Sequence, residues 1–186
     1  MILPIYIYGH PILRKVTKDI DPTNYPNLKG LIDNMFETMY QADGVGLAGP
    51  QVGLEDRIFV VDLTPLADEE HPEFKDMKKV FINAYITERG GDMIIAEEGC
   101  LSIPGVHEKV SREEEIRIQY LDENLQAHDQ VFNGFLARVI QHEYDHLDGI
   151  LFTDKISLLR KRMNKSKLAN MEKGKVACDY KIKTVR

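Results

Sequence analysis

The stretch from His142 to His146 constrains this chain more than any other, because it spaces two histidines four residues apart with Glu143 between them. Residues four apart on a helix lie one turn apart on one face, so both imidazoles can reach the same divalent ion. Glu143 faces the same side and can take a proton from a metal-bound water. The preceding residues 135–141 contain no Gly or Pro and favour such a helix. The alternative is a surface helix that carries these three side chains by chance.

Length and composition narrow the class of protein. A chain of 186 residues, of which 43% are hydrophobic and 29% charged, is typical of one globular domain with a substantial core. No apolar run approaches the roughly 18 residues of a membrane span, and the first residues show no secretory signal. Two cysteines, Cys100 and Cys178, are too few for a disulfide framework. We therefore expect a bacterial cytoplasmic protein that binds neither membranes nor DNA.

Charge is distributed unevenly along the chain. The net charge is -6, yet residues 155–186 hold eleven Lys and Arg against two acidic residues. Within a single domain we distinguish a catalytic metallohydrolase part, residues 1–159, from a basic C-terminal tail, residues 160–186, made of a helix that a strand could follow. Such a tail could contact a polyanion such as RNA. The alternative is a solvated helix, or a tail folded back on the acidic body.

The order of the expected elements indicates an α+β fold. Apolar residues from Leu28 to Met39 recur at helical spacing and predict an amphipathic helix, and a second helix is expected over residues 157–171, ending near Gly174. Exposed or Gly-rich loops are expected over residues 44–53 and 64–79. Strands are expected at 5–8, 58–61, 80–83 and 93–96, as a hairpin over 116–131, and at 176–182. Helix, several strands and helix in this order predict an antiparallel or mixed sheet.

A catalytic zinc-type site needs three protein ligands and one open position. Cys100 lies just after an apolar strand, and its thiolate would complete a Cys/His/His set. The alternative for Cys100 is a buried, unreactive cysteine, which is a common fate of a lone thiol. The residues alone leave both interpretations open.

Three separated segments resemble the motifs of the peptide deformylases. They read GVGLAGPQ at residues 44–51, EGCLS at 98–102 and QHEYDH at 141–146. All three occur in the family's order, and the resemblance extends from His10 to about Leu159. Two features depart from the family pattern. Gly49 stands where the first motif usually has alanine, and Gly174 interrupts the long C-terminal helix of some members.

The resemblance implies an α+β domain with antiparallel sheets around the central HExxH helix, with one helix before it and one after. It also implies an activity, the removal of the formyl group from the N-terminal methionine of new polypeptides, with release of formate. Cys100, His142 and His146 would then hold one divalent metal ion, Fe(II) first, with Zn, Ni or Co as alternatives.

The resemblance also assigns catalytic roles. Glu143 would be the general base and would pass its proton to the leaving amine. The side-chain amide of Gln51 and the backbone N–H of Leu101 would stabilise the oxyanion. Beneath the site we expect an ion pair between Glu98 and Arg112.

The pocket for the substrate methionine is expected against the metal helix. Phe135 and Val139 precede His142 by seven and three residues and share its face, with Val45 as a third wall. Gly46 would let an extended N-formylmethionyl peptide pair with the loop. Core packing is the alternative for the three side chains and a turn is the alternative for Gly46. Asp145 fits a charge on the helix surface.

Two other classes of function compete with this interpretation. A zinc-stabilised binding module would need a fourth convincing ligand, and a metallopeptidase would share the HExxH motif but not the upstream cysteine. A deformylase must work on nascent chains near the ribosome. We therefore also predict that an exposed helix contacts ribosomes through Arg160, Lys161, Arg162, Lys165 and Lys167.

Overall fold

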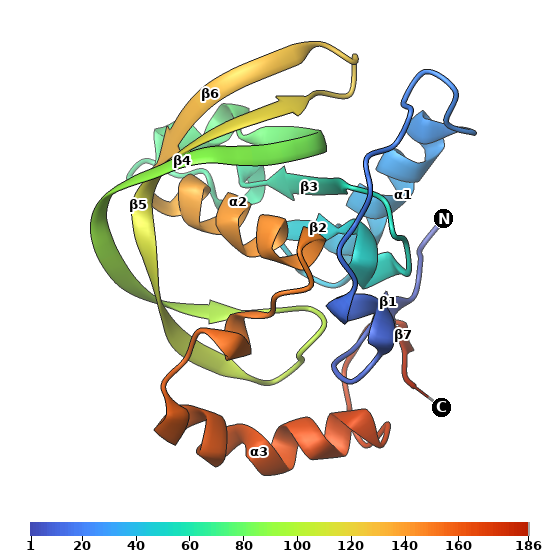
Figure 1. Cartoon of the computed structure of the whole chain (residues 1–186), viewed down its shortest axis with the longest axis vertical. Helices are drawn as coiled ribbons and strands as arrows, with labels where there is room; N and C mark the ends of the chain where they lie inside the picture. Colours follow the sequence, from blue (N-terminus) through green and yellow to red (C-terminus); the bar gives the residue numbers. More distant parts are fainter. Residues whose placement is uncertain (186) are drawn as a thin grey trace.

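A five-stranded antiparallel sheet forms the centre of the computed structural model, which describes residues 1–185. Its strands, in spatial order, are β2 (Gly46–Ala48), β3 (Ile58–Asp62), β4 (Lys78–Gly99), β5 (His107–Leu121) and β6 (Ala127–Asn133). The long strands β4 and β5 curve around helix α2 (Gly134–Leu147), which occupies the hollow of the sheet (Figure 1). The helix that carries the HExxH motif is therefore enclosed by the sheet.

Two further helices flank this centre. Helix α1 (Leu28–Gln41) packs against β2 and β3, and α3 (Leu158–Glu172) runs across the end of the molecule (Figure 1). A separate two-stranded parallel sheet joins β1 (Ile5–Tyr6) to β7 (Ile182–Lys183), so a segment near the start of the chain lies beside one near its end (Figure 1). The arrangement confirms the expected α+β fold with one helix before and one after the central helix. No helix within residues 1–185 is long and apolar enough to cross a membrane.

Strand β3 owes its burial on both faces to a helix on each side. Successive side chains of a strand point to opposite faces. Phe59 and Val61 accordingly join the core around α2, whereas Ile58 and Val60 join the core around α1. The apolar stripe predicted for the first helix forms the other half of that second core, where Met35 and the other buried side chains each contribute roughly 1.5–3 kcal/mol.

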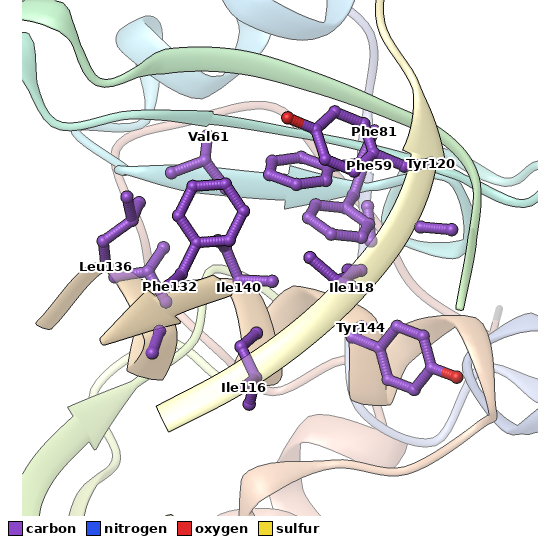
Figure 2. Packing of buried hydrophobic residues seen from close by; sticks show 14 of the residues in the cluster. Phe59, Val61, Phe81, Ile116, Ile118, Tyr120, Phe132, Leu136, Ile140 and Tyr144 are labelled. Carbon is purple, nitrogen blue, oxygen red and sulfur yellow. The ribbon is translucent and has the colours of Figure 1, made fainter. Parts of the chain in front are cut away.

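Aromatic side chains fill the space between the sheet and α2. The rings of Phe59 and Phe81 stack at 4.5 Å between centroids, and Phe81 lies 4.4 Å from Tyr120. Figure 2 shows these rings over the apolar side of α2, near Ile140. This packing fixes the position of α2, and through it the residues of the HExxH motif.

The structure differs from the expected elements in several places, among them the first strand, which covers only Ile5–Tyr6 of the expected 5–8. Residues 80–83 and 93–96 belong to one strand, β4, because register shifts near residues 82–85, 86–88 and 90–93 let it bend without breaking. Residues 44–53 are not a plain loop, since they contain β2 and a short 3-10 helix, Gly49–Val52.

The C-terminal part of the chain folds back on the body. Helix α3 ends just before Gly174, whose φ is +73°, as expected for a glycine that stops a helix. Met171 is buried in a third apolar cluster with Ile103 and Phe152. The last strand is shorter than the expected 176–182, because only Ile182–Lys183 pairs with β1. Of the expected tail, residue 186 lies outside the described residues.

Candidate metal centre

Helix α2 carries two of the three candidate metal ligands. The imidazole centroids of His142 and His146 are 5.3 Å apart, as the spacing of one helical turn requires. Every residue of α2 from Leu136 to Leu147 is buried. The enclosure by β4 and β5 causes this burial, and it rules out a surface helix with chance histidines. Asp148 caps the helix and Gly149, with φ +71°, turns the chain away.

Cys100 follows directly after β4 and reaches the histidines across the molecule. Its Sγ lies 3.3 Å from Nε2 of His146, and one ligand atom from each of Cys100, His142 and His146 lies within 4.8 Å of the others. A thiolate with two imidazoles suits a divalent transition metal, and three ligands leave a coordination position open. The three residues therefore fit a catalytic metal ion.

A buried network around Glu98 orients His142. The Glu98 carboxylate lies 2.9 Å from Nδ1 of His142 and accepts hydrogen bonds from Arg112 Nε at 2.6 Å and Arg138 Nη1 at 2.6 Å. Burial by itself would raise the pKa of Glu98, but hydrogen bonds from Arg112 and His142 outweigh burial and hold this pKa below its usual range. The ionised carboxylate favours a proton on Nδ1 of His142, which leaves Nε2 free as a ligand atom.

The same network settles two expectations about charged residues. The ion pair between Glu98 and Arg112 is confirmed. The interpretation of Asp145 as a surface charge is wrong, since Asp145 is 4% exposed and accepts a 2.8 Å hydrogen bond from Nη1 of Arg112. Strand β5 brings Arg112 beneath α2, a contact between segments far apart in sequence.

Glu143 lies in the interior beside the ligands. It is 5% exposed, and its Oε2 has no hydrogen-bond partner among the described residues. Burial raises its pKa to about 7. Its side chain passes over Gly46 of β2, where an added Cβ would lie 2.4 Å from Oε1 and 2.7 Å from Cγ of Glu143. Only glycine at position 46 leaves room for this carboxylate.

Gln51 is held with its amide nitrogen toward the ligands. The backbone N–H of Ala48 donates to Gln51 Oε1 at 2.8 Å, while Nε2 lies 3.2 Å from Ser102 Oγ and 3.5 Å from Cys100 Sγ. The side chain is 1% exposed, so its orientation is fixed by these contacts. One 3-10 helix, Gly49–Val52, thus presents a hydrogen-bond donor next to the candidate metal centre.

A cleft of about 600 Å³ opens onto this centre. It is lined by Cys100, His142 and Glu143, and by Gln51 and Leu101. The four residues expected to bind substrate, Val45, Gly46, Phe135 and Val139, also line it. Val139 is almost fully buried, whereas Phe135 is 43% exposed and packs its ring 5.9 Å from that of Phe74. His146 lies behind the wall of the cleft, 1% exposed.

The sequence did not reveal two parts of the cleft. Arg138 lines it and donates to the Val110 carbonyl at 3.0 Å and the Ile94 carbonyl at 2.6 Å. Its position four residues before His142 is a signal that helical spacing could have used. The C-terminal residues 177–180 also line the cleft, and no local pattern in the sequence predicts this.

Among these C-terminal residues, Tyr180 bonds directly to the turn that carries Cys100 and Leu101. Its hydroxyl donates to the Leu101 carbonyl at 2.6 Å. Burial raises the pKa of Tyr180, and electrostatic repulsion from Cys178 and Cys100 adds to this effect.

The amino-acid sequence of this chain is similar to those of known proteins over almost its whole length. Residues 2–162 match the model of a family described as polypeptide deformylase. A peptide deformylase from Christiangramia forsetii is 54% identical over 98% of this chain and 96% of its own length. One from Salinibacter ruber is 51% identical over 99% of this chain and 95% of its own length.

Solved structures of similar proteins share the fold. Arabidopsis thaliana peptide deformylase 1B, in complex with an inhibitor, superposes with a TM-score of 0.81 at 34% identity, covering 92% of this chain and 91% of that one. A peptide deformylase from Synechococcus elongatus in complex with actinonin gives a TM-score of 0.77 at 37% identity, covering 97% of this chain and 92% of that one.

Proposed function

The chain belongs to the polypeptide deformylase family, whose members remove N-formyl groups from nascent peptides, and on that premise we propose how its residues do so. The reaction depends on one divalent metal ion held by Cys100, His142 and His146. The proposal rests on one observation, that three ligand atoms converge within 4.8 Å beside the unpartnered Oε2 of Glu143. This ligand set suits Fe(II), Zn, Ni and Co alike. Fe(II) is the first candidate because the family resemblance implies it.

Glu143 is the general base of this proposal. When bound, the ion supplies Lewis acidity and lowers the pKa of a coordinated water. Glu143, whose pKa burial raises to about 7, takes the proton as water adds to the formyl carbon. It returns this proton to the methionine nitrogen as the carbon–nitrogen bond breaks, so that formate and a free amine leave.

Two fixed donors stabilise the negative charge that develops on the formyl oxygen. They are Nε2 of Gln51 and the backbone N–H of Leu101. Gln51 is supported by the hydrogen bond from Ala48 N–H to its Oε1, which fixes the orientation of its side-chain amide. Leu101 is supported by its backbone N–H, which donates to no atom of residues 1–185. Donors set in place before the reaction do not have to reorganise when charge appears.

The substrate methionine side chain binds against α2, between Val139, Phe135 and Val45, which line the cleft together. Its backbone pairs with β2 as an added strand. In support, β2 is the edge strand of the sheet, and Gly46 lines the cleft. The bare backbone at Gly46 also admits the Glu143 side chain.

Formate release tests this function and separates it from its competitors. The wild-type protein should release formate from formyl-Met-Ala-Ser and leave the unformylated peptide uncut. Cleavage of the control peptide would favour a metallopeptidase, and no reaction with either peptide would favour a binding module. Glu143→Gln should retain the metal and lose most of the activity. Near wild-type turnover by that variant would remove Glu143 from the role of base.

A second proposal concerns the ribosome, with which α3 makes contact through its basic residues. Arg162, Lys165 and Lys167 are exposed and make no ion pair among the described residues. Fewer basic residues are free to bind RNA than the five predicted from the sequence. Arg160 forms an ion pair with Glu108 at 2.7 Å, and Lys161 is half-buried. Charge of this kind supports salt-dependent binding to RNA.

Co-sedimentation with ribosomes tests this second proposal. The three exposed residues are replaced together by Gln, and a matched variant replaces Lys29, Lys75 and Lys109, which are exposed elsewhere. Only the α3 variant should lose binding at low salt. Equal pelleting of the two variants would leave α3 as a solvated helix. A bacterial cytoplasmic location fits both proposals and is supported by the two lone cysteines and by bacterial relatives.

A further inference from the structure

The C-terminal segment is built into the wall of the catalytic cleft. Residues 177–180 line the cleft together with residues of α2, although the family match ends at residue 162. The segment is anchored just beyond the cleft, where Ile5 N–H donates to the Lys181 carbonyl at 2.9 Å and Ile7 N–H donates to the Lys183 carbonyl at 3.1 Å. These bonds hold the segment against the body of the protein.

The turn after β4 is fixed by hydrogen bonds to three successive carbonyls. The Cys100 carbonyl accepts from Ile103 N–H at 2.9 Å, and the Ser102 carbonyl accepts from Tyr8 N–H at 2.8 Å. The carbonyl between them, that of Leu101, accepts from the Tyr180 hydroxyl at 2.6 Å. Tyr180 is the one side chain among the three donors.

Leu101 is held from two other directions as well. Its side chain and the Tyr180 ring pack against the same apolar cluster. Its Cδ1 lies against Gly44, where an added Cβ would approach to 2.7 Å. The N–H of Leu101 is thus left as the free polar group of a residue that is otherwise fixed.

We propose that Tyr180 is a positioning residue for deformylation, because its hydroxyl holds the Leu101 backbone so that the Leu101 N–H faces the reacting formyl group. The inference rests on the proposed role of Leu101. The Leu101 N–H shares one planar peptide unit with the Cys100 carbonyl, which Ile103 holds, and the Leu101 carbonyl belongs to the next unit, which Tyr180 holds. Because both units are held, rotation about the bonds of the Leu101 Cα between them is restricted. A donor that is held in place stabilises an oxyanion better than one that must reorient.

Tyr180→Phe tests the proposal by removing the hydroxyl and keeping the ring. Tyr120→Phe is the matched control, since the Tyr120 hydroxyl donates to Gln130 at the same 2.6 Å on β5 and β6, outside the cleft. Loss of one hydrogen bond predicts that kcat of Tyr180→Phe falls roughly fivefold. KM and bound metal should stay unchanged, and Tyr120→Phe should keep the wild-type kcat.

A second measurement does not depend on activity. The NMR order parameter of the Leu101 backbone amide, measured on the full chain, should be lower in Tyr180→Phe than in the wild type and unchanged in Tyr120→Phe. A Tyr180→Phe protein with wild-type kcat, or with the wild-type order parameter at Leu101, would overturn the proposal. Absence of formate release by the wild type would instead refute the proposed function, and the order parameter would still decide whether Tyr180 holds Leu101.

Discussion

Replacing Gly46 by alanine is the sharpest test of the active-site geometry. The new Cβ would lie 2.4 Å from Oε1 and 2.7 Å from Cδ of Glu143. Unstrained contacts between heavy atoms are roughly 3.5 Å, so the carboxylate must withdraw by roughly 1 Å. The three nearest atoms all belong to the Glu143 side chain, which can move without displacing the backbone. The protein should therefore still fold.

The size of the effect follows from this displacement. A misplacement of about 1 Å in a reacting group can lower the rate by about 10²-fold. Overpacking in a well-packed interior costs about 1–3 kcal/mol of unfolding free energy. We therefore expect kcat of Gly46→Ala to fall by about two orders of magnitude, with bound metal retained and only modest destabilisation.

Formate release under saturating substrate, together with metal analysis and thermal unfolding, measures these effects. Gly90→Ala is the matched control, because Gly90 also lies in a strand and an added Cβ there meets no atom within 4 Å. Both variants lose the backbone conformational freedom of a glycine, but only Gly46→Ala brings a Cβ into contact with Glu143. If kcat of Gly46→Ala equals that of Gly90→Ala, the position of Glu143 does not govern the reaction as argued.

Three other substitutions probe the remaining parts of the site. Cys100→Ser should weaken metal binding or change the preferred metal, because a neutral hydroxyl replaces a thiolate; unchanged metal affinity would place Cys100 outside the ligand set. Gln51→Ala should lower kcat by roughly 10²–10³ with little change in KM, and a defect in KM alone would assign Gln51 to substrate binding. Arg112→Met should cost about 3–5 kcal/mol in denaturant unfolding, because it leaves the buried Asp145 and Glu98 without their shared partner. If Arg112→Met had the wild-type free energy of unfolding, Arg138 and His142 would be enough to stabilise the buried charge of Glu98.

Local periodicity accounts for what the sequence predicted well. The pair His142 and His146 lies on one face of α2 because their spacing is a property of any helix. The apolar stripe of α1 follows from a 3.6-residue period in the same way, and the burial of β3 on both faces follows from its unbroken apolar run, residues 58–61. The three motifs of the family also predict that Cys100, Gln51 and Glu143 share one site, and all three line the cleft.

Contacts between distant segments decided the rest. Asp145 looks like a surface charge because nothing near it in sequence reveals that β5 brings Arg112 beneath α2. The steric reason for Gly46 is the Glu143 side chain, almost a hundred residues away along the chain. Tyr180 reaches Leu101 only because β7 pairs with β1 and folds the C-terminal segment over the cleft. Such pairings depend on which surfaces meet in the folded chain, and no short pattern of residues encodes that choice.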